Sequence, residues 1–352
     1  MNSKLGGKDS INMVYAPILV TTLNRYESFK RCIESLKQNS WADKTEVFIS
    51  VDYPPAPKYY EGYNKIKEYL ENGITGFKKV NIFFQEKNLG VIENCEWLRS
   101  LVCKSNDRYI VLEDDNELAP GFIEFCDKGL EIFEKDESIL ALNASDYVWC
   151  GNGYTPPVRK INKNENNVEK RQMVYHSVAY WEHKRKKAKY FCDEIGNNEG
   201  LTSLKNLLKL KKKSKCLFYN YLWKVALQKS SMPWYNNMLQ PIDFMLDIYM
   251  LINDKYVIYP IEPMLRDLGV DGSGVNYTEK FQNADKLRTR EIRSKKGFEY
   301  ILTDKIRINN EEFKLHDKND RIYLYIKIKV LSKYIIKSFK YKTLYGIDKK
   351  YI

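Results

Sequence analysis

The chain has 352 residues, and 43% of them are hydrophobic, so it has the length and the apolar content to bury a globular core. Its 58 Lys and Arg against 46 Asp and Glu give a formal net charge of +12, which favours anionic partners such as nucleotide phosphates, lipid phosphates, nucleic acid or an acidic membrane surface. The seven cysteines form no C-x-x-C pair, which favours reduced thiols over a disulfide framework. No stretch approaches the ~20 apolar residues of a membrane span, and the N-terminus lacks a signal-like apolar segment, so we expect a cytosolic protein.

Apolar, β-branched runs alternate with helical patterns over the first 150 residues. After the first run, Phe29, Cys32, Ile33 and Leu36 recur at helical spacing, and Glu27 stands near the start, where the helix dipole favours an acidic side chain. The expected elements are strands at 16–24, 46–52, 80–85, 108–115 and 138–145 and helices at 26–38, 61–72 and 91–104. This alternation predicts a parallel sheet with right-handed crossovers.

The pattern is less regular in the second half of the chain. Residues 151–175 are rich in Asn, Lys and Gly and predict a long surface loop. Residues 183–215 carry basic residues at both ends and predict an exposed helical insertion. A helix at 243–254 and a strand at 256–263 are expected to return to the core, and the pattern from about 285 onward is charged and helical.

Polar side chains stand where three of the expected strands end. Asn24 and Arg25 follow the first strand, Asp52 ends the second, and an acidic triplet at 113–115 ends the strand that begins at 108. Parallel sheets bind ligands at the carboxyl ends of their strands. We therefore expect these side chains to share one ligand-binding edge.

The acidic triplet consists of Glu113, Asp114 and Asp115. Neighbouring buried carboxylates repel one another and lose hydration unless a cation neutralises them. Mg²⁺ or Mn²⁺ is suited to this task, because hard ions take one or two carboxylates and complete their shell with phosphate and water. Such an ion would stabilise the charge on a departing nucleoside diphosphate. Acidic triplets also occur on solvated loops, so the triplet alone leaves both interpretations open.

Residues 16–150 carry a family resemblance. The segments APILVTTLNRYESFKRCI, VFISVDYP, NLGVIENC and YIVLEDDNELAPGFIEF resemble the donor half of GT-A glycosyltransferases, especially bacterial family 2 enzymes and the N-acetylglucosaminyltransferase I family. The resemblance implies that Arg25 and Asp52 contact the nucleotide and that Asp115 is the direct metal ligand. The other residues that it assigns to the nucleotide-sugar site are Thr21, Asn24, Asn88, Gly90, Glu113 and Asp114.

The second half resembles the same enzymes more faintly. The segment QPIDFMLDIYMLINDKYVIYPIEPMLRDLGVDGSG resembles the bacterial pattern S-W-D-x-x-W and the Gly-rich loop that follows it, although Ile242 and Leu246 replace the tryptophans. Asp243 matches the Asp of that pattern, and an inverting transferase needs one carboxylate to take the proton of the acceptor hydroxyl. Asp243 is therefore the candidate base, but it also suits the electrostatics of a helix N-terminus.

Further residues are expected around the acceptor. Asp247 and Glu182 are the fallback bases. The segment VYHSVAYWEHKRK resembles an aromatic segment beside the acceptor site, which implies a place there for Trp181. Arg266 and the loop at 269–274 could close over the diphosphate or form a plain surface turn.

The resemblance implies an α/β, GT-A-like (Rossmann-like) nucleotide-diphosphosugar transferase fold with a mixed, mainly parallel central sheet and a helical C-terminal extension. The expected parts are a nucleotide-sugar-binding half at 12–150, an acceptor-side half at 151–284 with its basic insertion at about 183–215, and a basic helical extension at 285–352. The expected reaction is Mn²⁺- or Mg²⁺-dependent transfer of a hexose or N-acetylhexosamine from a UDP-sugar to a glycan or lipid-linked glycan acceptor, with inversion.

Other interpretations remain open. A sugar-1-phosphate nucleotidyltransferase also places carboxylates and metal at strand ends, but its usual Gly-rich phosphate loop is missing, since TTLNRYESF holds no glycine. A non-catalytic module could bind membranes or polyanions through the Lys-rich segments, and an anionic inner membrane surface is a possible partner of the enzyme too. No G-x-x-x-x-G-K-[ST] loop, G-x-S-x-G motif or recognised nucleic-acid motif is present, so we expect no nucleic-acid partner.

Overall fold

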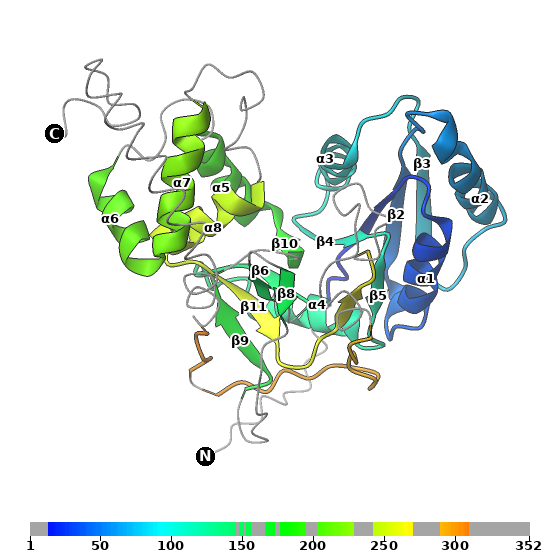
Figure 1. Ribbon diagram of the computed structural model, residues 1–352. Helices are drawn as coiled ribbons and strands as arrows, with labels where there is room; N and C mark the ends of the chain where they lie inside the picture. Colours follow the sequence, from blue (N-terminus) through cyan, green and yellow to red (C-terminus); the bar gives the residue numbers. More distant parts are fainter. Residues whose placement is uncertain are drawn as a thin grey trace.

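The computed structural model describes residues 13–145, 148–150, 153–155, 166–172, 177–194, 203–228, 242–269, 289–303 and 305–309. An eight-stranded sheet with the order β3-β2-β1-β4-β10-β6-β11-β9 runs through the molecule, and helices cover both of its faces (Figure 1). The α/β class and the mixed, mainly parallel sheet expected from the sequence are confirmed.

The first half of the sheet is wholly parallel. Its strands are β1 (Ile18–Thr22), β2 (Glu46–Val51), β3 (Lys79–Phe84) and β4 (Arg108–Glu113), and each expected strand lies within a residue or two of its predicted position. The connecting helices are α1 (Tyr26–Lys37), α2 (Tyr60–Glu71) and α3 (Val91–Val102), with short 3₁₀ turns at Ala42–Lys44 and Pro57–Tyr59. Because β1 lies between β2 and β4, the carboxyl ends of these three strands are neighbours.

The second half of the sheet is mixed. Strand β6 (Ile139–Asn143) and strand β11 (Tyr256–Pro260) pair in parallel, as expected of two buried apolar runs. Two strands were not predicted: β10 (Ser177–Trp181) runs antiparallel between β4 and β6, and β9 (Val168–Arg171) runs antiparallel along β11. Both halves of the chain therefore contribute to one continuous sheet.

The layers follow from the alternation of side chains along each strand. Ile18 and Val20 of β1 face the core formed with α1, α2 and α4 (Phe122–Ile132), whereas Leu19 packs with Leu98 of α3 on the other face. On the second half of the sheet a separate core gathers the remaining helices, which are α5 (Glu182–Glu194), α6 (Leu204–Lys213), α7 (Lys215–Gln228) and α8 (Ile242–Asn253). None of the helices among the described residues has the length and apolar character needed to cross a bilayer.

The basic segment at 183–215 differs from the expected exposed insertion. It does form helices, but α5 and α6 pack into the core of the second half. Lys184 is only 4% exposed, and its Nζ donates to the carbonyl oxygens of Phe133, Asp136 and Ile139 at 3.1, 2.9 and 3.1 Å. A lysine can enter a core in this way because its stem is apolar and three carbonyl oxygens accept hydrogen bonds from its ammonium group.

The described part of the expected C-terminal extension also differs from the prediction. Residues 289–303 and 305–309 contain no helix, and Tyr300 packs on α4, where it stacks on Phe125 and donates to its carbonyl oxygen at 2.8 Å. The rest of the extension and most of the expected loop at 151–175 lie outside the described residues. Two small antiparallel pairs complete the fold: β5 (Asn116–Leu118) with β12 (Leu265–Asp267), and β7 (Val148–Cys150) with β8 (Gly153–Thr155).

Candidate active site at the carboxyl edge of the sheet

The strand ends of β1 and β4 meet through Arg25, which precedes the first turn of α1. Its Nη1 donates to Oδ2 of Asp115 at 2.7 Å, and its Nη2 pairs with Oδ1 of Asp114. A planar guanidinium suits this task because its donors form a rigid fork that can serve two carboxylates at once. The structure therefore brings together three of the residues predicted to share one edge.

Thr22 was missed by the sequence analysis. Its Oγ1 donates to Oδ2 of Asp114 at 2.8 Å, so both oxygens of that carboxylate have partners. The predicted residue, Thr21, comes one position earlier and pairs with Glu113 in the sheet, so its side chain lies on the other face. The two-residue period of β1 was the signal that could have distinguished them, because Ile18, Val20 and Thr22 share the α1 face.

Asp114 and Asp115 are almost completely buried, and Asp115 is 6% exposed. Burial, followed by repulsion from Asp267, raises the pKa of Asp115 to about 7, against the opposing effect of Arg25. Burial also raises the pKa of Asp114, although Arg25 and Thr22 stabilise its charged form. One guanidinium thus compensates the two carboxylates only in part.

Asp267 is a further acidic residue that the sequence analysis did not single out. It ends β12, and the pairing of β12 with β5 places it opposite Asn116, next to the triplet. The backbone N of Leu268 donates to the carbonyl oxygen of Asp115 at 3.0 Å, which fixes the two segments to each other. This placement depends on a pairing between residues about 150 positions apart, so no local sequence pattern predicts that Asp267 lies beside the triplet.

Gly269 lies directly against the acidic cluster. Its N donates to Oδ1 of Asp267 at 2.8 Å, and a Cβ built at Gly269 would lie 2.1 Å from Oδ2 of Asp115. No side chain fits in that space without displacing the carboxylate. A glycine is therefore required here by close approach.

The chemistry of the cluster suits a hard divalent cation. Four carboxylates interact electrostatically here, those of Glu113, Asp114, Asp115 and Asp267, and the guanidinium of Arg25 opposes them with a positive charge. Oxygen ligands and surplus negative charge are what Mg²⁺ and Mn²⁺ require. Within the described ranges no three His, Cys, Asp or Glu side chains converge in a geometry that could hold a metal by themselves.

Asp52 organises the turn before α3. Its Oδ1 accepts from the N of Leu89 at 2.8 Å and its Oδ2 from the N of Gly90 at 2.9 Å. The side-chain amide of Asn88 donates to Oδ2 at 3.1 Å. Gly90 has φ +79°, a conformation that favours glycine. The predicted residues Asp52, Asn88 and Gly90 are thus in direct contact.

Asn24 follows β1, and its carbonyl oxygen touches α2. A Cβ built at Gly62 would lie 1.9 Å from that oxygen, so the glycine allows α2 to pack against the end of β1. This contact positions the backbone that leads into Arg25.

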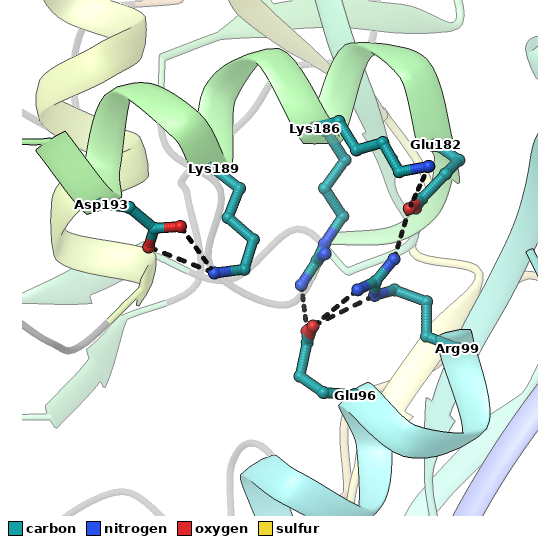
Figure 2. Close-up of polar contacts among 7 residues, drawn as sticks. Glu96, Arg99, Glu182, Lys186, Lys189 and Asp193 are labelled. Atoms are coloured by element: carbon teal, nitrogen blue, oxygen red, sulfur yellow. Dashed lines mark hydrogen bonds and ion pairs between the residues drawn. The ribbon is translucent and has the colours of Figure 1, made fainter. Parts of the chain in front are cut away.

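Trp181 and Glu182 are not brought to this edge. Strand β10 runs antiparallel to β4 and pairs Trp181 with Arg108, so both residues lie at the amino end of β4, roughly 16 Å along the strand from Glu113. Trp181 is fully buried and its Nε1 donates to the carbonyl oxygen of Leu130 at 3.1 Å. Figure 2 shows Glu182 in contact with Arg99 of α3 and with Lys186, 3.6 Å away.

The remaining predicted residues lie in the second half. Asp243 is the second residue of α8, and its side chain lies outside the description. Asp247, one turn later, is buried. Arg266 of β12 donates to Oε2 of Glu117 at 2.5 Å and to the carbonyl oxygen of Arg290 at 3.1 Å, so it ties β12 to β5 and to the segment after 289.

Comparisons with known proteins give a faint structural similarity. No family model matches the chain, and no curated protein matches its sequence. The crystal structure of S. aureus TarS aligns with 70% of this chain and 36% of its own, at 12% identity and a TM-score of 0.34. The TarS 1–349 fragment in complex with UDP aligns with 64% of this chain and 70% of its own, at 13% identity and a TM-score of 0.30.

Proposed function

We propose that this chain is a metal-dependent glycosyltransferase that moves a hexose or N-acetylhexosamine from a UDP-sugar to a glycan acceptor, with inversion. The observation that supports the proposal is the convergence of Arg25, the turn held by Asp52, and the Asp114–Asp115 pair at neighbouring strand ends. A parallel sheet presents its ligand-binding crevice at that edge.

The donor side is assigned residue by residue. Arg25 and the turn of Asp52, Asn88 and Gly90 hold the nucleotide, and Asp115 is the protein ligand of a divalent cation. A bound cation would supply the charge that stabilises the departing diphosphate. Arg25 already spans Asp114 and Asp115, so its guanidinium is positioned to exchange a carboxylate for a phosphate oxygen.

The acceptor side is carried by α8. Asp243, in its first turn, is the proposed base that takes the proton of the acceptor hydroxyl. Asp247 is the fallback base. Glu182 is no longer a fallback, because it contacts Arg99 at the other end of β4. The acceptor is proposed to be a surface glycan, free or attached to lipid.

A thermal-shift panel tests the donor site. UDP, GDP, CDP and TDP are each added with and without Mn²⁺ to the wild type and to Asp115→Asn, because a ligand that binds the folded state raises its melting temperature. We expect a Mn²⁺-dependent rise with UDP that Asp115→Asn abolishes. No rise with any nucleotide would contradict the proposal. In a separate assay, conversion of a sugar 1-phosphate and UTP to a UDP-sugar and pyrophosphate would identify the chain as a nucleotidyltransferase instead.

A further inference from the structure

Helix α6 (Leu204–Lys213) has an inner face that attaches it to the protein. Leu207 and Leu210 are buried in the core of the second half. Lys209 donates to Oδ2 of Asp254 and to the carbonyl oxygen of Ile252, both at 2.6 Å, and Lys213 also pairs with Asp254. The inner lysines are therefore used to fix α6 to the end of α8.

The outer face of α6 has a different composition. Leu204 and Leu208, one helical turn apart, are 53% and 57% exposed. At 100° per residue, Lys211 lies on one side of the two leucines and Lys205 and Lys212 lie on the other. Within the described part of the chain these three lysines form no ion pair, in contrast to the two on the inner face.

We propose that this outer face of α6 binds the surface of an anionic lipid bilayer. Leucines at the centre of a helical face enter the boundary between headgroups and acyl chains, while lysines at its margins extend to the anionic headgroups. A nucleic acid or another polyanion would use the lysines but would gain nothing from two exposed leucines. Figure 1 shows α6 at the outer flank of the helical part, away from α1 and α2.

Vesicle flotation of the full chain tests the proposal. The intact chain is expected to float with phosphatidylcholine vesicles that contain phosphatidylglycerol and to remain unbound with phosphatidylcholine alone. Lys205→Glu, Lys211→Glu and Lys212→Glu together should weaken the partition coefficient, by roughly fivefold for each lysine removed. A charge-matched control replaces the exposed Lys104, Lys295 and Lys296 with Glu and should float nearly as well as the wild type.

The leucines distinguish a bilayer from a polyanion. Leu204→Ser with Leu208→Ser should reduce flotation but leave retention on a heparin column unchanged, whereas Ile301→Ser with Leu302→Ser, two exposed positions elsewhere, should change neither. Melting temperatures near that of the wild type verify that each variant is folded. The proposal is overturned if the intact chain does not float, if the α6 lysine variant floats like its control, or if the leucine variant keeps full flotation.

Discussion

At the scale of single residues, the proposed donor edge depends on close contacts around Asp114 and Asp115. Arg25 and Thr22 supply hydrogen bonds to Asp114, and Arg25 also reaches Asp115. Gly269, two residues after β12, lies against the carboxylate of Asp115. The position of the Asp115 carboxylate is thus set by the donors of Arg25 and Asn116 and by the close approach of Gly269.

We expect Gly269→Ala to impair the donor site more than the fold. The added methyl group would lie 2.1 Å from Oδ2 of Asp115, so the carboxylate must move out of the geometry set by Arg25. A displacement of about 1 Å at a catalytic group costs on the order of 100-fold in rate. Titration calorimetry with UDP and Mn²⁺, together with a melting curve, measures the two effects separately. Wild-type affinity and turnover in a folded variant would show that Gly269 does not position Asp115.

At the scale of elements, Asp127 joins α4 to the start of β1. Its Oδ1 accepts from the backbone N of Ala16 at 3.0 Å, while Oδ2 is buried without a hydrogen-bond partner. Burial raises the pKa of Asp127 to about 7. The folded protein therefore retains a proton that the unfolded chain releases above about pH 4.

This difference predicts a pH-dependent stability. Because the pKa of Asp127 is higher in the folded state, its protonation adds about 4 kcal/mol to the free energy of unfolding below about pH 4. This contribution is lost as the pH rises through about 7. Asp127→Asn keeps the acceptor for Ala16 and cannot ionise, so it should gain stability relative to the wild type between pH 4.5 and 7.5. Urea unfolding at both pH values measures the difference in free energy of unfolding between the variant and the wild type. Groups that titrate equally in both proteins cancel in this difference. A difference that does not change with pH would contradict the assignment.

The elements also show why sequence patterns identified some parts of the fold and missed others. Strands β1 to β4 are short apolar runs between clear helices, so local periodicity locates them. Strand β10 has the sequence SVAYW, and its place between β4 and β6 depends on long-range pairing that no local pattern contains. Its antiparallel direction places Trp181, expected beside the acceptor, and Glu182, a fallback base, at the amino end of β4.

At the scale of the whole molecule, the two halves of the chain are joined by the sheet and by a partly buried polar contact between α3 and α5. Glu96 of α3 lies between Arg99 of its own helix and Arg185 of α5, and Arg99 also pairs with Glu182 (Figure 2). Arg99 pairs with carboxylates of both helices, and its side chain is only 10% exposed. The contact therefore fixes the position of α3 relative to α5 in the second half of the chain.

The candidate site was predictable in its donor half for a physical reason. In a parallel sheet, residues that follow successive strands must meet at one edge, so the positions of Arg25, Asp52 and Asp115 in the sequence were enough to group them. Asp267 and Gly269 reach the same edge only through the pairing of β12 with β5. The acceptor side has no such topological rule, and Asp243 remains a proposal.

The central claim is that Asp115 supports sugar transfer from a UDP-sugar, and release of UDP tests it most directly. Wild type, Asp115→Asn and a control, Asp107→Asn, are incubated with UDP-sugars and Mn²⁺, and water takes the sugar in place of a glycan acceptor. Asp107 is a matched control because it stands at the opposite end of β4, at the surface. We predict UDP release by the wild type and by Asp107→Asn, and a loss of about 100-fold or more in Asp115→Asn, since metal stabilisation of the leaving group is worth several kcal/mol. No release from any UDP-sugar, or equal rates for the two variants, would contradict the account.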